Sequence, residues 1–364
     1  MRSLGLAAAF LGCASPSKRA ELDTAEVEAI DPMIWSVRSV GPYQVGFSDF
    51  VVTYESSPAF PARTIRVNLW YPTVDEEGGR AAYTVGIDER VFQDATPAEP
   101  VHAGGYPVHL HSHGFQGYGA TSAFLARYFA SHGWVTIAPD HTENTIIDHV
   151  DPLPSSHYFQ RPLDVRESLD AVVEADLLGS PLNVERVIIS GHSFGAYTTW
   201  SSAGASYDLD RVAEMCATGE GLHADGCTDE EQAMFSTQLS DSRIVASIPM
   251  AGVLRRSWFG SSGELTTQGP VLFFGGSEDD RGQQEQFDQM GDIDFTWMEL
   301  EGACHQSFAL GACASLDSEL GFSLVQTASL AFARMTVLGD VSEEAVAIAT
   351  GEQALSDIVM THRR

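Results

Sequence analysis

The chain has 364 residues, of which 44% are hydrophobic and 10% aromatic, so it is long enough to bury a large core. Aspartate and glutamate number 50 against 20 lysines and arginines, which gives a net charge of −30 at pH 7. Because such a surface repels phosphate backbones and anionic lipid headgroups, we expect no nucleic-acid partner.

The N-terminus, MRSLGLAAAFLGC, has the pattern of an export signal. Arg2 precedes a short apolar stretch over residues 4–11, and Cys13 follows shortly after it. This stretch resembles the lipobox of bacterial lipoproteins, which implies lipidation of Cys13; the alternative is an ordinary secretory signal. We expect a signal peptide over 1–12, a polar linker over 13–30, and an exported protein that is secreted, periplasmic or tethered to a membrane through its lipidated N-terminus. No later stretch approaches the roughly 18 consecutive apolar residues that a membrane-spanning helix needs.

Beyond the linker, strand and helix patterns alternate along the chain. Period-two alternation, and short apolar runs ended by glycine or proline, predict strands over 64–72, 106–114, 134–140, 184–190, 243–252, 269–276 and 294–300. Helical spacing predicts helices over 122–133, 161–178 (with Pro162 at its start), 194–204 and 323–338. The alternation implies an α/β fold with a mostly parallel central sheet and helices on both faces.

A single domain over residues 31–340 accounts for these elements. Between 205 and 243 the alternation gives way to an acidic, polar stretch, which we interpret as a lid-like insertion that sets the acyl length and alcohol group of a substrate. Residues 341–364 are expected to form a helical tail.

The pentapeptide GHSFG is the first candidate for a catalytic motif. With 33 glycines in the chain, a Gly-x-Ser-x-Gly pattern arises easily by chance, so its setting has to decide. A predicted strand precedes it and a predicted helix follows, while Gly191 and Gly195 leave room for a sharp turn at His192 and Ser193. This is the arrangement of a nucleophile elbow, in which Ser193 attacks and the backbone N–H of Phe194 stabilises the oxyanion.

A serine nucleophile needs a histidine base and a carboxylate that orients this base. VLFFGGSEDD ends one predicted strand with three acids, and MELEGACHQSF ends the next with His305. We assign Asp279 as the acid, because its Gly-x-x-Asp spacing from Gly276 places it in the loop just beyond the strand. Asp280 and Glu278 are the alternatives.

The second oxyanion donor is expected from the loop that follows strand 106–114, HSHGFQGYG. We assign the backbone N–H of Phe115 to this role. The rings of Phe115 and Phe194 are expected to line an acyl or alcohol pocket; the alternative is plain core packing.

A metal site is the alternative interpretation of the same strand, because His109, His111 and His113 occupy every second position along it. A histidine row followed by Gly-Phe is already explained by the oxyanion strand, and the aspartate that accompanies such histidines in binuclear metallohydrolases is missing. We therefore expect no metal and no other cofactor.

Five cysteines are present, and setting Cys13 aside leaves an even number. Of the three connectivities, we favour Cys216–Cys227 and Cys304–Cys313, because each closes a short loop and an oxidising compartment preserves such bonds. The alternative is four reduced thiols.

The motifs LWYP, HSHGF, ASHGWVTIAPDH, RPLDVRESLDAV and SGHSFGAYT, in this order, resemble the α/β-hydrolase superfamily. More narrowly, they are similar to the dienelactone-hydrolase-like group related to platelet-activating-factor acetylhydrolases and polyester hydrolases. The resemblance covers roughly residues 60 to 340 and implies Ser193 as nucleophile, Phe115 and Phe194 as oxyanion donors, and His305 as base. The acid follows strand 269–276, as in dienelactone and polyester hydrolases, whereas the eukaryotic acetylhydrolases place it one strand earlier. Ala196 also stands where a third glycine is common.

The expected function is therefore carboxylic ester hydrolysis through an acyl-enzyme, with a small-molecule, lipid or polymer ester as the substrate. The alternative from another class is a catalytically silent, exported binding lipoprotein with the same fold.

Overall fold

The computed structural model describes residues 31–222 and 224–364. The expected signal peptide over 1–12, the linker over 13–30 and Cys13 lie outside the described residues. Within the described ranges, no helix is both long and apolar enough to cross a membrane.

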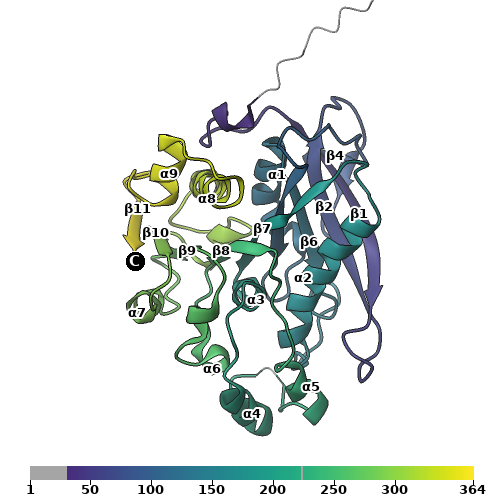
Figure 1. Ribbon diagram of the computed structural model, residues 1–364, viewed down its shortest axis with the longest axis vertical. Helices are drawn as coiled ribbons and strands as arrows, with labels where there is room; N and C mark the ends of the chain where they lie inside the picture. The colour runs from purple at the N-terminus through teal and green to yellow at the C-terminus, as the bar shows by residue number, and fades with distance from the viewer. Residues whose placement is uncertain (1–30, 223) are drawn as a thin grey trace, which may run out of the picture. The chain divides into compact units, whose positions relative to one another are not determined.

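In this part of the chain, eleven strands form one mixed sheet (Figure 1) in the order β11-β10-β9-β8-β7-β5-β6-β2-β1-β4-β3. Their bounds are β1 (Gln44–Tyr54), β2 (Arg63–Thr73), β3 (Arg80–Ala82), β4 (Ile87–Gln93), β5 (Tyr106–Ser112), β6 (Val135–Asp140), β7 (Leu182–His192), β8 (Ile244–Met250), β9 (Val271–Gly276), β10 (Phe295–Leu300) and β11 (Val359–Arg363).

The strands from β5 to β10 run parallel, and antiparallel neighbours lie at both ends of this parallel region. β5 pairs with β6 on one side and with β7 on the other, so the direction of chain progression through the sheet reverses at β5. In open α/β sheets, ligands bind outside the carboxyl ends of the strands at such a switch point. The loops after β5 and β7 are therefore where the fold favours a site.

Helices cover both faces of the sheet (Figure 1). Their bounds are α1 (Ala123–Ser131), α2 (His157–Glu174), α3 (Phe194–Ser202), α4 (Leu209–Thr218), α5 (Asp229–Met234), α6 (Arg256–Phe259), α7 (Gln283–Gln289), α8 (Ser318–Ala333) and α9 (Glu343–Ala349). Successive residues of β7 show the two faces: Ile188 packs with α1 and α8, while Ile189 packs with α2. A strand with both faces buried has a nearly continuous apolar run, as residues 187–189 of β7 do. The expectation of an α/β fold with a mostly parallel sheet is confirmed.

The helix predicted over 161–178 begins four residues earlier, so Pro162 lies inside α2 rather than at its start. Proline has no N–H to donate to the carbonyl of Tyr158, one turn back. The Tyr197 hydroxyl donates to this carbonyl instead, at 2.9 Å. A side chain of α3 thus supplies the hydrogen bond that the helix lacks, and α2 tolerates the proline.

The prediction of a helical tail over 341–364 is correct for its first part and wrong for its end. α9 is helical, but β11 adds an antiparallel strand to the edge of the sheet beside β10, with Met360 opposite Glu299. The tail therefore completes the sheet, since its backbone hydrogen bonds are made with β10.

The insertion over 205–243 contains α4 and α5, and a disulfide joins Cys216 of α4 to Cys227, which lies just before α5. Val212 of α4 and Met234 of α5 are buried in a cluster with Trp258 and Phe159. The described part of the insertion is thus packed onto the α2–α3 face of the domain.

Several histidines are buried without a hydrogen-bonded carboxylate, and their burial predicts how the stability of the protein depends on pH. Burial is the main cause that lowers the pKa to about 3 for His111 and His192 and to about 4 for His132 and His157; where these rings make backbone hydrogen bonds, those bonds oppose the shift. In the unfolded chain these side chains titrate near pH 6.5, so between about pH 4 and 6.5 the unfolded state binds more protons than the folded state.

We therefore expect the free energy of unfolding to fall as the pH drops from 6.5 to 5. On unfolding in this range, these histidines take up as many as four protons. Most carboxylates remain ionised in this window, so relief of the negative charge does not cancel the effect. Urea unfolding curves at half-unit pH steps measure the slope. A stability that is flat or rises on acidification would contradict the neutral, buried state of these rings.

Candidate active site

Ser193 occupies a strained turn between β7 and α3, with φ 57° and ψ −114°. Such a conformation costs on the order of 1–3 kcal/mol and persists only where the surroundings impose it. Here the Ser193 N–H donates to the carbonyl of Met250 on β8 at 2.9 Å. The Cβ of an alanine at position 191 would lie 2.2 Å from the Gly195 carbonyl oxygen, and one at position 195 would lie 1.9 Å from the Ser112 carbonyl oxygen. Both glycines are therefore required by backbone crowding.

The three predicted polar side chains meet at the carboxyl ends of the strands. His305 Nε2 lies 2.9 Å from Ser193 Oγ, and His305 Nδ1 lies 2.7 Å from Asp279 Oδ2. Asp279 follows β9 and His305 follows β10, so each comes from the loop expected for it. Asp280 instead accepts from the Gly282 N–H, and within the described chain Asp279 is the one acid that contacts the His305 ring.

Asp279 is held in its ionised form. Its burial raises the pKa, but hydrogen bonds from His305 and from Arg281 Nε, at 2.7 Å, outweigh burial and leave the pKa below its ordinary value. An ionised Asp279 accepts the Nδ1–H of His305, which leaves Nε2 free to accept a proton from Ser193.

His192 holds the backbone of His305 in place. Burial and the neighbouring His305 lower its pKa to about 3, so the ring is neutral near pH 7. Its Nε2–H donates to the His305 carbonyl oxygen at 2.8 Å. The residue between Gly191 and Ser193 therefore ties the elbow to the loop that carries His305.

The loop after β5 lies against the elbow. A Cβ added to Gly114 would lie 3.0 Å from the His192 ring and 3.3 Å from Ser193 Cβ, so a larger residue here would require these neighbours to shift by a few tenths of an ångström. Phe115 comes next in this loop and lines the same cleft as Ser193 and Phe194. Phe194 is the first residue of α3, where backbone N–H groups have no partner within the helix.

Arg161 of α2 supports this loop and was missed by the sequence analysis. It is fully buried; its guanidinium donates to the His113 carbonyl and to Ser112 Oγ, and it lies over the Phe194 ring at 4.4 Å from the ring centre. It also donates to Asn144 Oδ1 at 2.8 Å. A buried guanidinium needs several acceptors, and the structure supplies them from the end of β5 and the loop after it, from Asn144 and from the helix α3.

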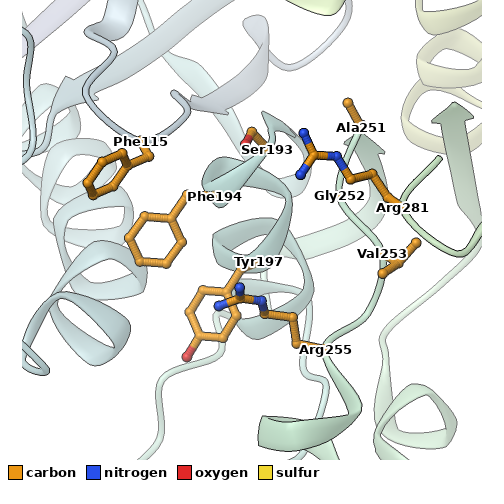
Figure 2. Close-up of a pocket in the computed structure, with 9 residues that line it drawn as sticks. All are labelled: Phe115, Ser193, Phe194, Tyr197, Ala251, Gly252, Val253, Arg255 and Arg281. Atoms are coloured by element: carbon orange, nitrogen blue, oxygen red, sulfur yellow. The ribbon is translucent and has the colours of Figure 1, made fainter. Parts of the chain in front are cut away.

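Two clefts meet at Ser193. The larger cleft has a volume of about 410 Å³ and is lined by Phe115, Ser193, Phe194, Tyr197, Ala251, Gly252, Val253, Arg255 and Arg281 (Figure 2). The smaller cleft, of about 290 Å³, is lined by residues 114–118, Thr121, Ile146, His192, Ser193, His305, Gln306, Ala309 and Leu310. Neither lining includes a described residue of the 205–243 insertion, so the expectation that this segment sets the acyl and alcohol groups has no support from the lining of either cleft.

The three histidines of the predicted row, two on β5 and His113 directly after it, are engaged in hydrogen bonds. His109 contacts Thr136 and Ser190, His111 contacts Ser190, and His113 accepts from the His141 N–H at 3.0 Å. Among residues 31–222 and 224–364, no group of three or more histidine, cysteine or acidic side chains could hold a metal ion.

The predicted Cys216–Cys227 bond is present, whereas Cys304 and Cys313 are free thiols, so the second predicted disulfide is not formed. Cys304 Sγ faces the Ala312 carbonyl at 3.5 Å, and Cys313 Sγ faces the Gly302 carbonyl at 3.4 Å. Each sulfur thus points at a backbone acceptor in the loop after β10.

The sheet order and the elbow between β7 and α3 define the α/β-hydrolase fold. Residues 81–213 match the family model of chlorophyllase, a segment that includes Phe115 and Ser193 and ends before Asp279. The ferulic acid esterase from Streptomyces cinnamoneus is similar in structure, with a TM-score of 0.56 over 85% of this chain and 94% of that chain, at 17% sequence identity. No curated protein matches the chain in sequence.

Proposed function

We propose that the protein is a serine hydrolase that cleaves carboxylic esters through an acyl-enzyme. The observation that carries this proposal is the hydrogen-bonded series from Ser193 Oγ through His305 to Asp279, at 2.9 and 2.7 Å, at the mouth of two clefts. These contacts lie within the reach that nucleophile–base–orienter arrangements require.

In the first half of the reaction, Ser193 Oγ attacks the ester carbonyl carbon while its proton passes to His305 Nε2. The carbonyl oxygen becomes an oxyanion, for which the N–H groups of Phe115 and Phe194 are the proposed donors. The tetrahedral intermediate collapses, the bond to the alcohol oxygen breaks, and His305 gives its proton to this leaving oxygen. Asp279 remains ionised and stabilises the imidazolium.

In the second half, a water molecule loses its proton to His305 Nε2 and attacks the acyl carbon. The second tetrahedral intermediate expels Ser193 Oγ, which takes the proton back from His305, and the carboxylic acid leaves.

The comparisons support an ester as the substrate. The family model that matches residues 81–213 is that of chlorophyllase, and the similar solved structure is a ferulic acid esterase. Small-molecule, lipid and polymer esters all contain the carbonyl that this mechanism needs.

Export remains part of the proposal, with attachment to a membrane through a lipidated Cys13. The Cys216–Cys227 disulfide supports it, because such bonds persist in oxidising compartments.

Labelling with an alkyl fluorophosphonate tests the proposed nucleophile. We expect the folded wild type to take up one phosphonyl group, which peptide mass spectrometry locates at Ser193, and Ser193→Ala to take up none. The wild type unfolded in urea is the control, because an unactivated serine does not react. A folded wild type that neither labels nor turns over p-nitrophenyl butyrate would favour the silent binding protein.

A further inference from the structure

The two clefts that meet at Ser193 are chemically different, and the position of His305 indicates which part of an ester each cleft binds. His305 lines the smaller cleft and is absent from the lining of the larger one. In the proposed mechanism, His305 protonates the leaving oxygen, so the alcohol part must lie beside its ring. The alcohol therefore belongs in the smaller cleft, and the acyl chain belongs in the larger cleft.

The larger cleft pairs an aromatic wall with two cations. Figure 2 shows the rings of Phe115, Phe194 and Tyr197 on one side, with the guanidinium groups of Arg255 and Arg281 reaching in from the other. Among the nine described residues that line it, none carries a carboxylate, although the chain has 50 acidic residues. The charged side chains that line this cleft are thus opposite in sign to the net charge of the protein.

Both cations can take a further partner. Arg255 is exposed and forms no ion pair within the described chain; its hydrogen bond is to the Tyr158 hydroxyl, at 3.4 Å. Arg281 uses Nε for Asp279, at 2.7 Å, and its side chain is 48% exposed. A guanidinium binds carboxylate and phosphate groups through parallel N–H donors, so the unused edges of these two side chains suit an anion.

The smaller cleft has a different character. Ile146 and Leu310, which line this cleft and not the larger one, each leave a large part of an apolar side chain exposed, at 53% and 59%, and Phe115, at 39%, lines both clefts. Exposed apolar groups that gather around one cleft favour an apolar ligand part.

We propose that this hydrolase selects esters whose acyl chain carries a carboxylate or another anionic group at its far end, which Arg255 and Arg281 bind, and whose alcohol part is apolar. The selection rests on the proposed ester hydrolysis and names its substrate class. It also opposes the net charge of −30, which by itself favours cationic substrates.

The test compares two p-nitrophenyl esters of equal shape. Mono-p-nitrophenyl adipate ends in a carboxylate, and p-nitrophenyl 6-methylheptanoate replaces this carboxylate with an isopropyl group. Anion selectivity is the ratio of their kcat/KM values at constant ionic strength, after subtraction of the uncatalysed rates. We expect a ratio above one for the wild type, and a ratio lowered about tenfold by Arg255→Gln, since charge-assisted hydrogen bonds are the strong ones.

Arg255 is the side chain to change because Arg281 also bonds to Asp279. Arg38→Gln is the matched control: it removes the same charge from a partly exposed arginine that pairs with Glu344 and lines neither cleft, and it should leave the ratio unchanged. p-Nitrophenyl 6-aminohexanoate, with a cationic end, should be a poorer substrate than either ester.

A second pair tests the assignment of the clefts. 4-Carboxyphenyl pentanoate and phenyl pentanoate differ by a carboxylate on the alcohol side, and Arg255→Gln should not change their ratio. Loss of selectivity in this pair as well would overturn the acyl assignment. Equal turnover of the adipate and 6-methylheptanoate esters by the wild type, or an unchanged ratio in Arg255→Gln, would overturn the anionic substrate class while leaving ester hydrolysis intact. Absence of turnover of every ester, without fluorophosphonate labelling, would instead reject the proposed function.

Discussion

His305→Ala should lower kcat for p-nitrophenyl butyrate by about 10⁴- to 10⁶-fold, the range expected when the base of such a triad is removed. His305 Nε2 is the acceptor placed 2.9 Å from Ser193 Oγ, and among the described residues no other side chain is hydrogen-bonded to this hydroxyl. KM should change far less than kcat, because the imidazole acts on the proton rather than on the acyl chain. Initial rates over a range of substrate concentrations measure both constants.

The loss in His305→Ala would report chemistry rather than unfolding. The His305 side chain is 24% exposed, and its removal leaves Asp279 still paired with Arg281, so no buried charge is left alone. Its thermal unfolding should therefore resemble that of the wild type. Asp279→Asn is the companion variant: it keeps the size of the side chain but favours the wrong tautomer of His305, and kcat should fall by about 10⁴-fold. Rates close to wild type in either variant would refute the assigned roles.

Local patterns were sufficient for the elements around the proposed nucleophile. The run VIIS, the two glycines and the helix that follows are short-range features, and each depends on crowding or burial that neighbouring residues create. The contact of His305 with Ser193 spans 112 residues, yet it was predictable because consecutive parallel strands end at one edge of the sheet. The catalytic roles of these residues remain predictions.

Features that depend on distant partners were not predictable from local patterns. The start of α2 is an example, since the hydrogen bond that lets Pro162 lie inside the helix comes from Tyr197. β11 is another, because an edge strand has one neighbour and carries a weak pattern of its own. Arg255 and Arg281 belong to no motif in the sequence, and only the fold places both in the cleft that Ser193 lines. The orientation of the Cys304 and Cys313 sulfurs could not be predicted from their spacing in the sequence either.

Asp164→Ala should lower the free energy of unfolding by about 3–5 kcal/mol, the cost of leaving a buried charge without its partner. Asp164 is fully buried; its carboxylate accepts from Arg63 at 2.7 and 2.9 Å, from the Tyr54 hydroxyl at 2.7 Å and from His141 Nδ1 at 2.8 Å. Burial raises its pKa, but Arg63 and His141 outweigh burial and hold the pKa well below the ordinary range. Urea unfolding monitored by tryptophan fluorescence measures the change.

The same carboxylate acts at a distance on the proposed oxyanion loop. It fixes His141 with Nδ1 protonated, so Nε2 accepts from the Ser112 hydroxyl at 2.9 Å, and Ser112 Oγ in turn accepts from Arg161 at 3.1 Å. Arg161 then holds the His113 carbonyl, two residues before Phe115. Loosening this series at Asp164 should therefore lower kcat even at temperatures where the variant is folded, because oxyanion donors act only when they are held in place.

Asp49→Ala is the matched control for Asp164→Ala. Asp49 also accepts from an arginine, Arg66 at 2.9 Å, but the two side chains are 30% and 27% exposed. Partly exposed pairs of this kind contribute at most about 1 kcal/mol, so this variant should be nearly as stable as the wild type and should keep its kcat. If the two alanine variants lost equal stability, burial would not explain the cost of removing the Asp164 carboxylate from its partners. If Asp164→Ala were destabilised but kept a wild-type kcat, the route from Asp164 through Arg161 to the loop would not govern the proposed oxyanion site.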